Sequence, residues 1–145
     1  KMLEKIHHKK KLFALIIRKK YRKKRGINFF SSKKDNQQIG YMSHKKNHII
    51  YPHLHRRRDA RIFYTTEVII LLKGKLRVDF YDNKKKYLFS KTLSKNDIIY
   101  LIQGAHGFKV LNPIEMIEIK QGPYLQSKDK IKFLNVSEKK IKIKN

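Results

Sequence analysis

The stretch that decides the fold runs from residue 65 to residue 81 and reads TTEVIILLKGKLRVDFY. Its first half, up to Leu72, is an almost unbroken run of β-branched and aliphatic residues, which is typical of a buried strand. Residues 76–81 then alternate apolar and polar side chains with the period of two that a half-buried strand shows. Because Gly74 stands between the two halves, the pattern predicts a β-hairpin with its turn at Gly74.

Short strand-like segments separated by turn residues continue on both sides of this stretch. The sequence predicts strands or strand-like segments at residues 12–17, 27–30, 39–51, 87–93, 98–102, 108–111 and 114–120. Turn formers such as Asp82-Asn83, Asn96-Asp97 and Asn112-Pro113 separate the later ones. No segment has a convincing amphipathic helical pattern, so we expect an all-β sandwich or barrel.

The composition limits the possible classes of protein. A chain of 145 residues with 40% apolar residues has the usual size of one domain. It has no apolar run of eighteen residues and no cleavage pattern of a secretory signal, so we expect a cytoplasmic protein without a membrane span. Cysteine is absent, which excludes disulfides and thiolate ligands and leaves histidine and carboxylate as the strong ligands for a transition metal.

The formal net charge of +26 favours anionic partners, among them nucleic acid, anionic membrane surfaces and acidic small molecules. The alternative is a biased coding genome, because lysine, isoleucine and asparagine are abundant together. The lysines are scattered through nearly every segment, whereas nucleic-acid readers tend to concentrate arginine and exposed aromatic residues. A small anionic molecule is therefore the favoured partner, and nucleic acid is the less favoured one.

Three residues form the first part of a candidate metal site. His53 and His55 are two positions apart, so in an extended segment both imidazoles project from the same face. Glu67 opens the apolar run and shares its side of the strand with Ile69 and Leu71. A carboxylate on a face with a buried pattern requires a partner, and a metal ion is one such partner.

His106 is the fourth candidate ligand. It follows a buried-type strand and lies in the segment 103–108, QGAHGF, whose two glycines allow a sharp turn that aims the imidazole inward.

These residues together resemble the two motifs of the cupin superfamily. The first motif is represented by His53-Leu54-His55, Glu67 and Gly74, and the second by Asp97, Gly104 and His106. The segment between His55 and Glu67 is longer than in the usual motif. The segments 38–42, QIGYM, and 118–124, EIKQGPY, together with His106-Gly107-Phe108, resemble a group of small bacterial cupins of unassigned activity that often accompany sugar and surface-polysaccharide genes.

The resemblance implies a jelly-roll barrel over residues 12–133, with a basic N-terminal extension at 1–11 and a lysine-rich C-terminal tail at 134–145. It implies one divalent transition-metal ion, either iron, manganese, nickel, zinc or copper, held by His53, His55, Glu67 and His106. It also implies a homodimer, since cupin barrels commonly pair through their sheets.

Arg56, Arg58 and Arg61 lie in the loop between two of the ligands and suit a phosphate or carboxylate group of a substrate. The alternative is a solvated charged loop. Tyr124 is a candidate to close the cavity, with simple packing as the alternative. The sequence assigns no catalytic residue.

Three functions remain open at this point. The first is a metal-dependent enzyme that isomerises, epimerises or oxygenates a small anionic molecule such as a sugar or sugar phosphate. The second is a non-catalytic cupin that binds a metal or a ligand. The third is a basic protein that binds nucleic acid on a cupin scaffold, and it predicts affinity that falls steeply with salt.

Overall fold

A computed structural model describes residues 1–23, 25–125 and 129–144, and it confirms the all-β class. Its helical content is the short 3-10 turn η2 (Glu138–Lys140). Lys24 and residues 126–128 of the predicted barrel, and Asn145 of the predicted tail, lie outside the described residues. Across the described ranges, no helix is long and apolar enough to cross a membrane.

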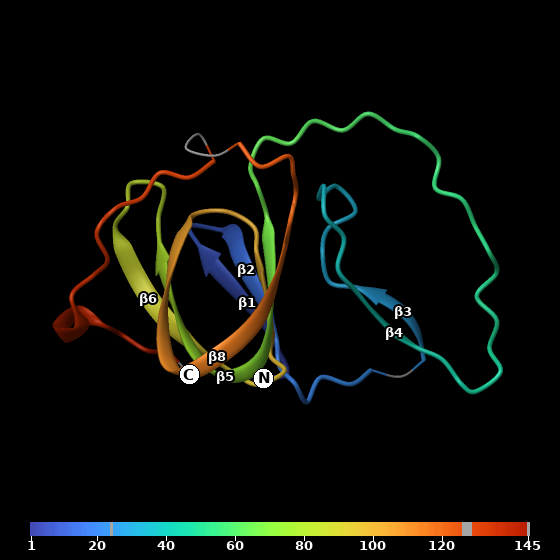
Figure 1. Cartoon of the computed structure of the whole chain (residues 1–145), viewed down its shortest axis with the longest axis horizontal. Helices are drawn as coiled ribbons and strands as arrows, with labels where there is room; N and C mark the ends of the chain where they lie inside the picture. The colour runs from blue at the N-terminus through green and yellow to red at the C-terminus, as the bar shows by residue number, and fades with distance from the viewer. Residues whose placement is uncertain (24, 126–128, 145) are drawn as a thin grey trace.

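The main sheet is antiparallel and curls into a half-barrel (Figure 1). Its strand order is β1 (Leu3–His8), β2 (Lys11–Ile17), β7 (Ile98–Leu101), β5 (Glu67–Tyr81) and β6 (Tyr87–Ser94). The long strand β8 (Ala105–Lys120) pairs with the other edge of β5. A separate two-stranded sheet consists of β3 (Gly26–Phe29) and β4 (Gly40–Ser43).

The inner face of the half-barrel holds the larger hydrophobic core. From β5 it receives Ile69 and Leu71 and then Leu76, Val78 and Phe80. The inward side chains therefore change from odd to even positions between residues 71 and 76. A strand keeps its side-chain alternation unless an extra residue is inserted, so this change marks a β-bulge. The register of the β5–β8 pairing shifts at the same positions.

The predicted hairpin at Gly74 is wrong. Gly74 lies inside β5 with a φ of +81°, and β8 pairs with β5 on both sides of it. In the same way, β8 continues through Asn112 and Pro113, where the sequence predicted the end of a strand. A glycine between two strand-like runs is compatible with a hairpin turn or with a bulge, and local sequence does not distinguish them. Here the bulge bends one long two-stranded ladder.

Residues 3–8, which the sequence analysis assigned to an extension outside the barrel, form β1 and pair with β2. Glu4 holds this edge strand in place, because its carboxylate accepts hydrogen bonds from Arg18 and Lys91, each over 2.6 Å. Arg18 also donates to Asp97 in the turn between β6 and β7, over 2.9 Å. A lysine-rich segment can therefore form an edge strand, because the ion pairs of Glu4 with Arg18 and Lys91 attach it to the sheet.

The C-terminal tail packs against the outer face of the barrel instead of fraying. Arg77 is buried and donates two hydrogen bonds to Asp79 and two to Glu138 of the tail, over 2.7–3.1 Å. Ser90 of β6 exchanges backbone hydrogen bonds with Lys142 and Lys144. The tail therefore covers charged groups that β5 and β6 turn outward.

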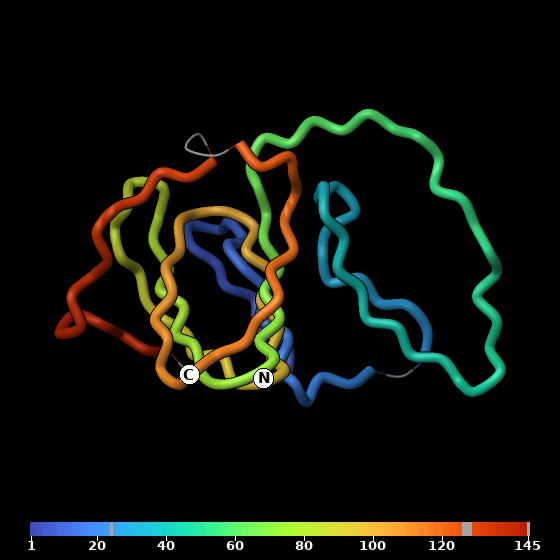
Figure 2. Tube along the Cα trace, in the orientation of Figure 1, coloured from blue at the N-terminus to red at the C-terminus, as the bar shows by residue number. Residues whose placement is uncertain are grey.

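The β3–β4 hairpin is anchored to the outer face of the sheet. Beside the hairpin, Phe30 and Ile39 pack against a second cluster that contains Val68 and Tyr100. The carbonyl of Gln37 accepts a hydrogen bond from the Tyr100 hydroxyl over 3.2 Å. Residues 44–66, which we call the arm, connect β4 to β5 without a helix or strand. The middle of the arm lies away from the barrel beyond the hairpin (Figure 2), and residues 63–66 return to the barrel.

Replacement of Gly74 by alanine is expected to lower the free energy of unfolding by about 2 to 5 kcal/mol. The added Cβ would overlap the carbonyl of Pro113, whose carbon would lie 2.8 Å away, and φ is positive. The control is Gly26→Ala, where φ is also positive but nothing lies within 4 Å of the added Cβ. Urea unfolding measures both, and equal midpoints for Gly74→Ala and the wild type would show that the bend does not require glycine.

Glu138 provides a pH-dependent test of the tail contact. Hydrogen bonds from Arg77 and then Lys109 lower the pKa of the Glu138 carboxyl from 4.5 to about 2. A lowered folded-state pKa stabilises the fold above the unfolded-state value, and this contribution is lost as the pH falls toward 2. The wild type should therefore unfold at higher urea than Glu138→Gln at pH 7, with a gap that shrinks below pH 4.5. A gap independent of pH would contradict the contact.

Candidate functional site

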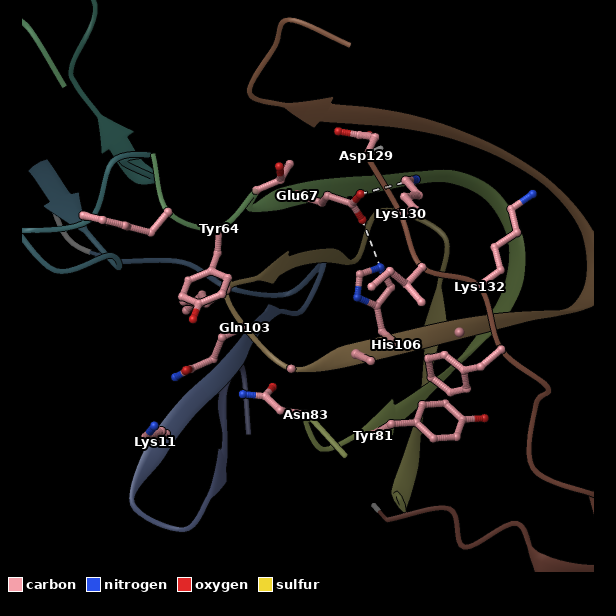
Figure 3. Close-up of a pocket in the computed structure, with 18 of the residues that line it drawn as sticks. Lys11, Tyr64, Glu67, Tyr81, Asn83, Gln103, His106, Asp129, Lys130 and Lys132 are labelled. Carbon is pink, nitrogen blue, oxygen red and sulfur yellow. Dashed lines mark hydrogen bonds and ion pairs between the residues drawn. The ribbon is translucent and has the colours of Figure 1, made fainter. Parts of the chain in front are cut away.

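A cavity of about 750 Å³ opens at one end of the half-barrel (Figure 3). Its lining comes chiefly from the end of the arm at residues 63–65, the two ends of β5, the β7–β8 connection with the start of β8, and the segment 129–135 that follows β8. Four aromatic side chains, Phe63, Tyr64, Tyr81 and Phe133, contribute apolar surface. Ligand sites are commonly concave, partly apolar and furnished with a few converging polar groups, which is the composition found here.

Glu67 and His106 meet in this cavity, with Oε2 of Glu67 2.9 Å from Nε2 of His106. Glu67 pairs with Lys120 at one end of the β5–β8 ladder, and His106 pairs with Phe80 near the other end. In a flat antiparallel ladder these two residues would be far apart, since each position adds about 3.3 Å. The bend at Gly74 folds the ladder back and brings its ends together.

The connection from β7 to β8 sets the position of His106. Leu101 pairs with Glu67 in the sheet, and residues 102–104 lead from there to the start of β8. Gly104 has a φ of +79°, and a Cβ on it would lie 2.5 Å from the ring of Phe13. The Gln103 side chain donates to the carbonyl of Leu12 over 2.9 Å. This glycine therefore lets the connection pass close over the core.

Glu67 is nearly buried, with 6% of its surface exposed. The hydrogen bond with His106 lowers the pKa of the Glu67 carboxyl, burial acts in the opposite direction, and the charge of Lys130 lowers the pKa further. The carboxylate is therefore held in its ionised form, which is the form that binds a cation or accepts a proton.

Lysines surround the carboxylates at the cavity. Lys130 Nζ lies 3.5 Å from Oε1 of Glu67 (Figure 3). Lys120 donates a hydrogen bond to Asp129 over 3.1 Å. Lys11 and Lys132 also line the cavity. The lining therefore carries three lysines against the two carboxylates of Glu67 and Asp129, and this excess of positive charge favours an anionic ligand.

The structure brings two of the four predicted metal ligands together and leaves the other two on the arm. His53 and His55 are exposed, their ring centroids are 5.2 Å apart, and Nδ1 of His53 lies 3.0 Å from the carbonyl oxygen of Tyr51. Within the described residues, no three histidine, aspartate or glutamate side chains gather as metal ligands would. Glu67 and His106 therefore form a pair without the two histidines of the arm.

The predicted substrate-binding residues lie apart from the cavity. Arg56 and Arg58 line a second hollow with His55, and Arg61 is exposed, its carbonyl accepting a hydrogen bond from Asn36 over 2.8 Å. Tyr124 is 68% exposed, and the ammonium of Lys120 lies 5.2 Å from its ring centroid. None of these four residues lines the cavity that holds Glu67 and His106.

Sequence reasoning missed the cavity residues that follow β8, above all Asp129 and Lys130. They belong to a lysine-rich segment with no strand pattern, and no local signal indicates that it returns to the barrel mouth. The cavity positions of Tyr64 and Tyr81 were also missed. In the sequence these two aromatic residues stand at the two ends of the fold-deciding stretch, and this is the one local signal for them.

The chain was also compared with known proteins. No protein-family model, no curated protein and no solved structure matches it.

Proposed function

We propose that the chain is a metal-binding cupin-type protein whose cavity accepts a small anionic molecule, with a sugar phosphate as the favoured class. The observation that carries this proposal is the contact between Glu67 and His106 inside a lysine-lined cavity. A carboxylate and an imidazole are common ligands of divalent transition metals in a site without thiolates.

The geometry of the pair suits an ion. Two ligands bound at right angles, each about 2.1 Å from one ion, lie about 3.0 Å from each other. The 2.9 Å between Glu67 Oε2 and His106 Nε2 is close to this separation, which also suits the hydrogen bond seen here. Catalytic metal sites generally use at least three protein ligands, so we propose His53 and His55 as the remaining ones. Iron, manganese, nickel, zinc and copper all accept this set.

The remaining cavity groups would bind and orient the anionic molecule. A bound divalent ion would supply Lewis-acid polarisation of a substrate oxygen. Lys130 and Lys132 would hold a phosphate or carboxylate group, and Tyr64 and Tyr81 would pack against its apolar part. Such an arrangement supports an enzyme of the isomerase, epimerase or oxygenase type, with a non-catalytic binding protein as the competing class.

Metal content tests the ligand assignment. We expect about one divalent ion per chain in untagged wild-type protein, and less than about a tenth of that in His106→Ala and Glu67→Gln, since each removes a ligand. Elemental mass spectrometry after purification and after titration with the five metals measures the content. His48→Ala is the matched control, because His48 is exposed and stacks on His44 away from the pair. Wild-type protein that takes up none of the five metals would exclude the proposed metal centre.

Binding of a hexose phosphate tests the anion site. Lys130→Ala is expected to raise the dissociation constant about 3- to 10-fold, because one partly exposed charge is lost from the cavity. Isothermal titration calorimetry measures the constant. Lys95→Ala, in the turn between β6 and β7, controls for the change in net charge. If both variants bind with the same affinity, Lys130 has no part in recognition.

A further inference from the structure

Strand β8 has a free edge. One edge pairs with β5 from Ala105 to Lys120, and the described residues form no ladder with the other. Large apolar side chains on both faces of β8 are also 37–53% exposed: Phe108, Val110, Leu111, Met116, Ile117 and Ile119. A long apolar edge strand is a ready template for pairing with another chain, and natural proteins usually cover such an edge.

The arm carries exposed apolar side chains that match the exposed apolar edge of β8. It is a long connection without secondary structure, which is unusual inside a compact domain unless it has a function. Between residues 49 and 62 its large apolar side chains are 46–91% exposed: Ile49, Ile50, Tyr51, Leu54 and Ile62. At roughly 150 Å² for a whole side chain, the exposed parts of the arm and of β8 together come to about 900 Å² in each copy, compared with about 800 Å² per partner in a stable interface.

The anchoring of the arm directs it away from its own β8. Phe30 and Ile39 fix the base of the β3–β4 hairpin on the outer face of the barrel, and Thr66 at the end of the arm hydrogen-bonds to Gln37 over 2.7 Å. The middle of the arm extends past the hairpin, which lies between it and the barrel in Figure 1. Residues 49–62 of the arm therefore present their apolar side chains away from their own barrel, where a neighbouring molecule can contact them.

We propose that two copies of this chain exchange arms, so that the arm of each copy lies along the free edge of β8 in the other. A symmetric exchange covers both edges with one kind of contact and closes the assembly at two copies. It also carries the partner's His53 and His55 toward the barrel that holds Glu67 and His106. This placement of the partner's His53 and His55 rests on the proposed metal-binding function. Each metal site would then contain ligands from both chains.

Complementation between two variants tests the shared site. One variant carries His53→Ala and His55→Ala, and the other carries Glu67→Gln and His106→Ala. Each alone should bind less than a tenth of the wild-type metal. After the two are refolded together, mixed dimers form one intact site from two chains, so metal content should rise to about a quarter of the wild-type value. Each variant refolded alone is the control. No recovery in the mixture would show that each arm serves its own barrel and would overturn the proposal.

Oligomeric state tests the exchange without any metal. The full chain should sediment as a dimer, and Ile50→Asp with Leu54→Asp on the arm, both exposed and away from the cavity, should raise its dissociation constant at least about 100-fold. The control is Leu134→Asp, which places the same charge at a residue 92% exposed outside the arm, and this variant should remain dimeric. A monomeric wild type, or a dimer that both arm substitutions leave intact, would overturn the arm exchange. If the arm substitutions dissociate the wild-type dimer but the wild type binds no metal, the arm exchange stands and only the proposed metal-binding function is refuted.

Discussion

The bend of the β5–β8 ladder at Gly74 is the constraint on which the rest of the structure depends. It lets one pair of long strands contribute to both walls of the half-barrel, and it reverses which positions of β5 face inward. The core is continuous across the bend because Leu71 and Leu76 both point inward on either side of it. The same bend brings Glu67 and His106, from opposite ends of the ladder, to within 2.9 Å.

The two halves of the proposed metal site differ in how firmly they are held. Glu67 and His106 are fixed by backbone pairing in the sheet and by their hydrogen bond. His53 and His55 belong to the arm, which has no ladder of its own. The site is complete only when the arm is docked. Metal binding should therefore strengthen arm docking, and arm docking should strengthen metal binding by the same factor.

Much of the fold is predictable from the sequence, because most strands are marked by β-branched alternation and by turn formers such as Asn96-Asp97. The inward direction of Glu67 was also predictable from its alternation with Ile69. The bulge at Gly74 was not, since its flanking lysines suit a turn equally well. Lys130 reaches the cavity through long-range folding of the chain after β8, which leaves no local pattern.

We propose that His106 and Glu67 bind one metal ion together with two imidazoles from the arm. Electron paramagnetic resonance of the copper(II)-loaded protein tests it directly, because the splitting of the signal reports the nitrogen ligands of the ion. We predict three imidazole nitrogens in the wild type and, because His106→Ala removes a ligand, less than about a tenth of the wild-type signal of bound copper in that variant. A copper spectrum that the His106→Ala substitution leaves unchanged would contradict the claim.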